Sequence, residues 1–276
     1  MNPLPHAQIG LGCVTFGREI DEAASFALLD HACEHGVRHF DTAAAYGSGA
    51  SETILGKWLA SRKPEGITVA TKILPPYDHI DITSSLQRLG VEQIDLLYLH
   101  QWHTTALQAG PALDDLVHSG VVKQLGASNF SLEQLQASGQ RFRVVQNNHN
   151  LAVSDVSNEL RAHCVANGIS IVTFSPLGAG FLTGKHHSGV QAGSRFEIIP
   201  GHQQVYFHEP AYQRLARLEA VAKRAGHSQV HLALAWALHQ PGIDFVLVGG
   251  RSPAHLDQAF AALDFDDAAL LAELTS

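Results

Sequence analysis

Residues 67–100 read ITVATKILPPYDHIDITSSLQRLGVEQIDLLYLH, and this stretch contains the unit that decides the fold. The run ITVATK ends at Lys72 and the run IDLLYLH ends at His100, and both have the composition and length of buried strands. Between them, Ile82 to Leu89 has a helical pattern, and Gly90 follows where a helix needs a left-handed cap. A strand, a helix and a second strand in this order predict a βαβ unit with parallel strands.

The same alternation continues in both directions along the chain. Strand-like runs end near Gly12, Asp41, Lys72, His100, Ser128, Gln146, Ser175 and Gly249. Helical patterns also cover Asp21 to His35, Ser51 to Ser61, Leu132 to Ala137 and Val156 to Asn167, with stop signals at Gly36, Gly120 and Gly168. Because eight parallel strands close a barrel, we predict the α/β class and a (β/α)8 TIM barrel as a single domain over residues 1–276.

Composition narrows the possible partners. Hydrophobic residues make up 45% of 276 residues, and 18 Lys and Arg against 26 Asp and Glu give a net charge of −8. This charge argues against general affinity for nucleic acid or anionic membranes. The start, MNPLPHAQIG, lacks the features of an export signal, and no run of about 18 apolar residues occurs. We expect a cytoplasmic protein with no nucleic-acid or membrane partner, and the oligomeric state stays open.

Cysteine and histidine give no sign of a metal centre. Cys13, Cys33 and Cys164 form no CxxC pair, which argues against both a disulfide framework and a zinc site. The 18 histidines include the pair His186 and His187, but no HExxH or comparable ligand spacing accompanies them. We therefore predict surface positions for this pair and no bound metal.

Four polar residues, Asp41, Tyr46, Lys72 and His100, lie at or just after the ends of three successive predicted strands. Parallel neighbouring strands would bring them to one mouth of the barrel, and that set suits carbonyl reduction. Hydride addition to a carbonyl needs a proton donor at the oxygen, and a tyrosine with a pKa of about 10 is a reluctant acid. A nearby lysine would lower that pKa, a carboxylate would orient the lysine, and a histidine would bind the same oxygen.

Each of these residues also has an ordinary structural interpretation. Asp41 is a candidate helix or turn cap, and Tyr46 in a glycine-flanked turn is a candidate shield for a loop. Lys72 at a strand end is commonly solvated, and His100 is one of 18 histidines. The joint order and strand-end placement favour catalysis.

The second half of the chain supplies groups that suit a nicotinamide dinucleotide. The segment GSGAS at Gly47 lacks the rest of a GxGxxG motif, so a doubly wound nucleotide fold is not indicated. Ser128, Asn129 and Gln146 end two predicted strands and could hydrogen-bond a carboxamide. Phe174 could stack on the nicotinamide ring.

Two further segments suit the phosphates of such a cofactor. In SPLGAGFLTGK, small residues from Gly178 to Gly184 allow close backbone approach, and Lys185 supplies positive charge. In VLVGGRSPAHLDQ, Arg251 precedes a helix that begins near Pro253, a combination that suits the 2′-phosphate of NADP. The alternatives are an ordinary glycine-rich loop and an arginine that only lines the rim of the barrel.

With these residues in hand, the chain resembles the aldo-keto reductase family over nearly its whole length. The motifs are GLGCVTFG, FDTAAAYG, TK, LHQW, GASNF, Gln146, FSPLGAGFLTGK and GGRSPAHLDQ, in this order. The resemblance implies a (β/α)8 fold and NADPH, or NADH, bound in an extended pose. It also implies a catalytic tetrad of Asp41, Tyr46, Lys72 and His100, in which Tyr46 donates the proton.

The sequence departs from the family pattern at the adenosine end, where His255, Gln258 and Ala259 replace the family's common glutamine, glutamate and asparagine. Phe174 keeps an aromatic ring but carries no hydroxyl group. The complete predicted cofactor-binding set is Gly12, Cys13, Val14, Asp41, Ser128, Asn129, Gln146, Phe174, Ser175, Pro176, Leu177, Gly178, Gly180, Leu182, Lys185, Arg195, Gly249, Arg251, His255 and Gln258.

The predicted activity is NADPH-dependent reduction of a small carbonyl compound, reversible toward alcohol oxidation. The predicted substrate pocket contains Val14, Tyr46, Trp102, Asn129, Tyr206 and Phe207, the last two from a long irregular loop between residues 185 and 210. The first alternative is a cofactor-binding regulatory subunit that senses redox state. The second is an isomerase that uses Lys72 as a Schiff-base nucleophile.

Overall fold

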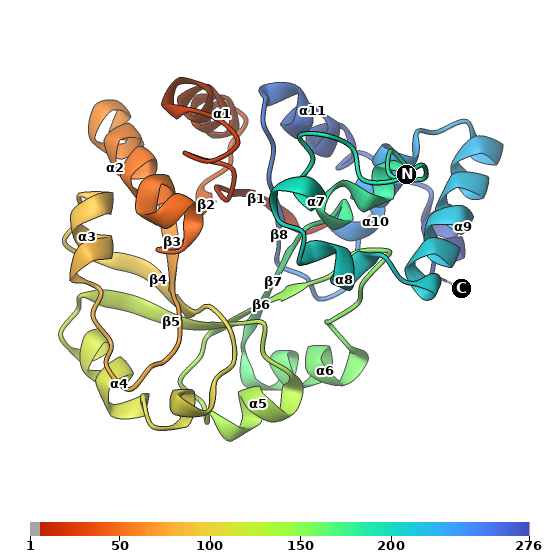
Figure 1. The fold of residues 1–276 in the computed structure, drawn as a ribbon. Coiled ribbons are helices and arrows are strands. Elements are labelled where there is room, and N and C mark those ends of the chain that lie inside the picture. Colours follow the sequence, from red (N-terminus) through yellow and green to blue (C-terminus); the bar gives the residue numbers. More distant parts are fainter. Residues whose placement is uncertain (1–5, 276) are drawn as a thin grey trace.

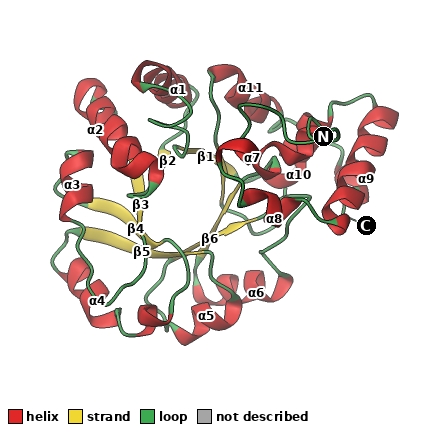
Figure 2. Cartoon of the chain, in the orientation of Figure 1, coloured by secondary structure: helices red, strands yellow, loops and turns green. Residues whose placement is uncertain are grey.

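A closed parallel barrel forms the centre of the molecule (Figure 1). The computed structural model describes residues 6–275, and within this range eight strands pair in sequence order, with β8 returning to β1. Figure 2 shows the strands inside and the helices outside. The predicted (β/α)8 barrel is therefore confirmed. Residues 1–5 and residue 276 lie outside the described residues. The stretch MNPLPHAQIG, for which we expect no export signal, begins with residues 1–5.

All eight predicted strand runs become strands. Their ends differ from the predicted ends by at most two residues, the largest difference being β6, which continues past Gln146 to Asn148. The strands are β1 Gln8–Gly12, β2 His39–Asp41, β3 Thr68–Ile73, β4 Ile94–Leu99, β5 Val122–Ser128, β6 Val144–Asn148, β7 Ser170–Phe174 and β8 Phe245–Val248.

Helices follow the strands and cover the barrel. They are α1 Glu22–Glu34, α2 Ala50–Arg62, α3 Thr83–Leu89, α4 Gly110–His118, α5 Leu132–Ala137, α6 Asn158–Asn167, α9 Glu209–Ala225, α10 Gln229–Leu238, α11 Pro253–Ala261 and α12 Ala268–Glu273. Short 3-10 turns are η1 Tyr46–Gly49, η2 Thr104–Leu107 and η3 Gly178–Thr183. None of the helices in residues 6–275 combines the length and apolar character needed to cross a membrane.

Local sequence signals explain where several helices begin and end. The Asp21 carboxylate accepts a hydrogen bond from Ala24 N at 2.9 Å and caps α1. Gly90 and Gly168 end α3 and α6 in the left-handed conformation, with φ of 65° and 62°. The other two predicted stop residues, Gly36 and Gly120, also have positive φ.

The apolar core has two layers, and these decide which face of each strand points into the barrel and which points toward the helices. Inside the barrel, a small cluster includes Leu96, Tyr98, Val144 and Leu247. A much larger cluster fills the space between the barrel and its helices. Because successive strand residues point to opposite faces, this division decides which side chains reach the mouth of the barrel.

The segment between residues 185 and 210 differs from the predicted irregular loop. It contains two short helices, α7 Arg195–Ile198 and α8 His202–Tyr206, which lie inside the ring of outer helices (Figure 1). Aromatic packing explains why this segment has regular structure, because the centres of the Phe196 and Phe207 rings lie 4.8 Å apart. The Tyr206 hydroxyl also accepts a hydrogen bond from Asn148 Nδ2 of β6 at 3.0 Å. The segment is thus attached to the barrel.

We expect Gly56→Ala to destabilise the fold, although alanine is the better helix former. A Cβ at this position of α2 would lie 2.7 Å from the carbonyl oxygen of Leu89, and closer still to that of Arg88, at the end of α3. Displacing a packed helix end costs about 1–3 kcal/mol, which outweighs the gain in helix propensity of roughly 1 kcal/mol. Urea denaturation measures the effect.

Gly201→Ala is the matched control, because a Cβ there meets no atom of the described residues within 4 Å and its φ of −58° suits any residue. An unchanged or raised unfolding midpoint for Gly56→Ala would show that α2 and α3 are not in close contact.

Candidate active site

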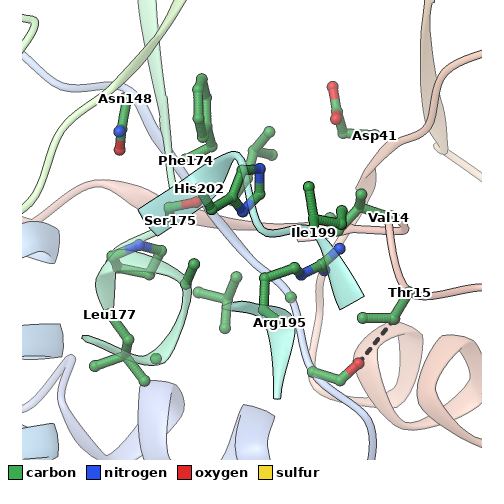
Figure 3. Close-up of a pocket in the computed structure, with 18 of the residues that line it drawn as sticks. Val14, Thr15, Asp41, Asn148, Phe174, Ser175, Leu177, Arg195, Ile199 and His202 are labelled. Atoms are coloured by element: carbon green, nitrogen blue, oxygen red, sulfur yellow. Dashed lines mark hydrogen bonds between the residues drawn. The ribbon is translucent and has the colours of Figure 1, made fainter. Parts of the chain in front are cut away.

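A deep cavity opens at the carboxyl ends of the strands. Its volume is about 1150 Å³, and strand ends and the following loops from both halves of the barrel line it. Figure 3 shows part of this lining, with Val14 and Thr15 on one side and Ser175 and Leu177 on the other. This is the face on which barrels of this class build their active sites.

A buried ion pair lies beneath the cavity. Lys72 and Asp41 are only 1% and 2% exposed, and Lys72 Nζ pairs with Asp41 Oδ1. The ammonium also donates to the carbonyl oxygen of Thr42 at 2.8 Å, and Gln146 Nε2 donates to Asp41 Oδ2 at 2.8 Å. Burial is the largest single effect and disfavours the ammonium, but the charge of Asp41, the interaction with Tyr46 and the hydrogen bonds to both together outweigh it, and the pKa of Lys72 is raised. Lys72 is therefore a positive charge at neutral pH.

Tyr46 lies directly beside this charge. Lys72 Nζ is 5.0 Å from the centre of the Tyr46 ring. The turn that carries the tyrosine is held by Ser51, whose hydroxyl donates to the carbonyl of Cys13 at 2.8 Å and bonds the hydroxyl of Thr42 at 2.7 Å.

Burial raises the pKa of Tyr46, and Lys72 lowers it by its charge and by a hydrogen bond, as predicted. The net result still lies above the ordinary value, because the loss of water around the phenol outweighs the neighbouring ammonium. Tyr46 therefore keeps its proton at neutral pH.

His100 completes the group. Its ring lies 5.7 Å from the Tyr46 ring at an interplanar angle of 78°. Burial, reinforced by the charge of Lys72, lowers the pKa of His100 to about 4, so the imidazole is neutral at physiological pH. Its Nδ1 is buried and has no hydrogen-bond partner among residues 6–275. The structure thus brings all four predicted catalytic residues together.

Another wall of the cavity contains the residues predicted to hold the nicotinamide end of the cofactor. Asn129 has a left-handed φ of 58°, and its amide nitrogen donates to the carbonyl of His100 at 2.9 Å. Ser128 and Gln146 lie beside it in the cavity lining, and Phe174 reaches the lining from the end of β7 (Figure 3). Polar amide groups and an aromatic ring thus share one wall.

The far end of the cavity is basic. Lys185 and Arg251 both line the cavity, and burial, together with the charge of Arg251, lowers the pKa of Lys185. Arg251 directly precedes α11, and its backbone N–H donates to His255 Nδ1 at 3.1 Å. In Figure 3 the dashed line joins the Thr15 hydroxyl to the carbonyl oxygen of Gly250, 2.9 Å away. This end is suited to an anionic group.

The α7–α8 segment borders the cavity from above. Arg195 Nη1 pairs with Glu19 Oε1 at 2.9 Å, joining this segment to the loop after β1. Arg195, Ile199 and His202 lie between the two walls in Figure 3. Prediction from sequence found Arg195 but missed Thr15, Arg18, Asn148, Ile199 and His202. Arg18 and Thr15 were detectable as neighbours of a strand end, whereas Ile199 and His202 lie in a segment without clear periodicity.

Of the predicted cofactor-binding residues, 17 line the cavity and three do not. The three are Cys13, Gly178 and Leu182. Cys13 and Leu182 are fully buried, because both belong to the large apolar cluster between the barrel and its helices. Gly178 lies against the Tyr206 ring, to which an added Cβ would approach within 3.0 Å.

Two residues of the predicted substrate pocket, Trp102 and Phe207, do not line the cavity. Tyr206 lines the cavity, but Phe207 packs against Phe196, and Trp102 lies edge-on to Phe130 with ring centres 5.2 Å apart. The surface prediction for His186 is also wrong, since this residue is 3% exposed and packs 4.9 Å from the Phe196 ring. His187 has a side chain that is 54% exposed, as predicted.

The comparisons with known proteins agree with this geometry. The profile of the Aldo/keto reductase family matches residues 8–270. The chain therefore belongs to the aldo/keto reductase family, a family of oxidoreductases.

Individual relatives are similar along most of their length. The chain is 27% identical to "Uncharacterized oxidoreductase YrpG" of Bacillus subtilis (strain 168), covering 94% of this chain and 87% of that protein. It is 28% identical to "Probable voltage-gated potassium channel subunit beta" of Arabidopsis thaliana, covering 91% and 85%. An aldo-keto reductase from Klebsiella pneumoniae, solved in complex with NADPH, has the same fold, with a TM-score of 0.76, 23% identity and coverage of 98% and 94%.

We expect Asp41→Asn to lower the free energy of unfolding by about 3–5 kcal/mol, because it leaves the buried Lys72 ammonium without its counter-charge. Glu22→Gln is the control, since Glu22 pairs with Lys57 at the surface, where both side chains are about half exposed. That change should cost less than about 1 kcal/mol. Chemical denaturation compares the two, and equal small losses would show that Lys72 is stabilised by other groups.

Proposed function

We propose that this protein is an NADPH-dependent reductase of aldehydes and ketones, reversible toward alcohol oxidation, with Tyr46 as the proton donor. The observation that carries the proposal is the contact between a protonated phenol, a buried ammonium and a neutral imidazole at the floor of one cavity. Membership of the aldo/keto reductase family supports it.

The cavity fits a phosphorylated dinucleotide by its chemistry. The basic end formed by Lys185 and Arg251 at the start of α11 suits the 2′-phosphate of the adenosine. Phe174 and the amides of Asn129 and Gln146 suit the nicotinamide end. The NADPH complex of the Klebsiella pneumoniae protein supports the same cofactor. When bound, NADPH supplies a hydride. NADH is the alternative donor, but it lacks the 2′-phosphate that Arg251 would bind.

The residues of this chain then have separate roles. Tyr46 is protonated at neutral pH, since the ordinary pKa of a phenol is about 10 and burial raises it further, and it donates that proton to the substrate oxygen. The Lys72 charge stabilises the phenolate that remains, so the interaction is strongest in the transition state. His100, neutral and with one unpartnered nitrogen among the described residues, binds and orients the carbonyl. Asp41 keeps Lys72 charged and in place.

The substrate class follows from the remaining lining. Val14, Ile199, Val205 and Tyr206 give the lining apolar and aromatic surface, beside polar groups such as Asn148 and His202. Such a wall accepts small and medium carbonyl compounds of varied shape.

The central experiment replaces Tyr46 by phenylalanine. With NADPH and 4-nitrobenzaldehyde, the loss of NADPH absorbance should slow at least about hundredfold in kcat, because the phenol proton is used in the transition state. The dissociation constant for NADPH, measured by fluorescence quenching, should stay nearly unchanged.

Tyr212→Phe is the matched control. Tyr212 packs against Phe181, 5.2 Å between ring centres, and does not line the described cavity. This variant should keep wild-type turnover. Wild-type turnover in Tyr46→Phe itself would remove Tyr46 from the mechanism.

A second prediction concerns the cofactor. Arg251→Ala should weaken NADPH binding by about 1.5–3 kcal/mol, the range for a lost charge-assisted hydrogen bond, and should leave NADH binding nearly unchanged. Titration calorimetry with both dinucleotides measures the difference. Equal losses for the two would place the 2′-phosphate elsewhere.

A cofactor-binding regulatory subunit is the second candidate, favoured by the similarity to the plant protein named as a potassium channel subunit. The same assay separates the two functions, because a regulatory subunit would bind NADPH tightly without turning over any carbonyl substrate tested. The isomerase alternative loses support. A Schiff-base lysine needs a neutral amine, and Lys72 is held charged by Asp41.

A further inference from the structure

A group of three metal-ligating side chains lies on the outer helical layer, away from the cavity. His31 and His35 are one helical turn apart at the end of α1, and Asp257 belongs to α11, which packs beside α1 (Figure 1). His31 Nε2 lies 2.7 Å from Asp257 Oδ1, and one ligand atom of each residue lies within 4.8 Å of the other two. Among residues 6–275 this is the one group of three such side chains gathered so closely.

His35 is oriented by its surroundings. His35 Nδ1 bonds the carbonyl oxygen of His31 at 2.8 Å, and because a carbonyl only accepts, Nδ1 carries the hydrogen. His35 Nε2 is thereby left with a lone pair, the state that a metal ligand requires. The His35 ring is also stacked on Phe260, with centres 4.9 Å apart and an angle of 10°. A backbone carbonyl and an aromatic ring thus hold the imidazole in position.

We propose that His31, His35 and Asp257 bind one zinc ion that joins α1 to α11. Two imidazole nitrogens and one carboxylate oxygen form a ligand set typical of Zn²⁺, with a water molecule as the fourth ligand. Tetrahedral bonds of about 2.0–2.1 Å place neighbouring ligand atoms roughly 3.3 Å apart. The ligand atoms now lie within 4.8 Å of one another, and closing them to this spacing would use rotation of the exposed Asp257 side chain toward the imidazoles.

The ion would connect the first and last βα units of the barrel. Asp257 lies 226 residues after His31 in the chain, and their helices flank the place where β8 pairs with β1. On another face, α11 contributes His255 and Gln258 to the cavity. The ion therefore fixes the helix that carries the adenosine end of the site. None of its three ligands lines the described cavity, so the proposal is independent of the proposed reductase activity.

A second histidine pair with the same spacing provides an internal control. His227 and His231 are stacked with ring centres 5.6 Å apart, but their neighbour is the Phe265 ring. In the described part of the chain they do not belong to a group of three ligands.

The test uses full-length protein without an affinity tag, freed of metal with EDTA, and Zn²⁺ alone as the probe. Isothermal titration should show one high-affinity site, and Zn²⁺ should raise the melting temperature. His35→Gln and Asp257→Asn should each weaken that site by about tenfold or more and reduce the thermal shift. His231→Gln should bind as the wild type does.

The melting temperature of each variant in EDTA shows that it is folded before metal is added. Crystals grown with Zn²⁺ should give an anomalous peak between α1 and α11. Wild-type binding in His35→Gln, a peak at His227 and His231 instead, or no saturable binding would each overturn the proposal.

Discussion

The buried ion pair between Lys72 and Asp41 is the interaction on which the rest of the site depends. Two charges with almost no exposure to water are tolerated only when both are fully hydrogen-bonded, and Thr42 and Gln146 complete the set. The pair thus ties β2, β3 and β6 at the floor of the cavity. Its positive member acts on both neighbours in the cavity: it helps to keep His100 neutral and partly offsets the effect of burial on Tyr46.

The barrel divides rigidity and adaptability between its parts. Strand ends carry the ion pair, His100 and the amides of Asn129 and Gln146, so their positions are fixed by parallel pairing and by the core. The basic part of the cavity, with Lys185 and Arg251, and its border at α7 and α8 come from loops and short helices, joined by contacts such as Arg195 with Glu19. The residues whose chemistry needs fixed geometry therefore lie at strand ends. The loops and short helices can pack around a large cofactor.

The ligand group on α1 and α11 lies in the outer helical layer, away from the cavity. His31, His35 and Asp257 come from the two helices that meet where the chain closes the barrel, and all three side chains are at least partly accessible to a ligand from solvent. A metal ion at this point would act on the closure of the fold rather than on the reaction. The spacing of His31 and His35 is ordinary for a helix, and the third member becomes visible only when α11 lies beside α1.

Local pattern by itself determined the eight strands, the ends of five helices to within two residues and the four residues at the cavity floor, because apolar runs and the polar residues that follow them are features of short segments. Tertiary structure alone decided which face Cys13 and Leu182 take, why Trp102 and Phe207 pack away from the cavity, and why His186 is buried. It also decided the direction of the Tyr46 pKa shift, since desolvation depends on everything packed around the phenol. The ligand group of α1 and α11 joins residues 226 positions apart. Contacts of that kind are made by folding, and no local pattern encodes them.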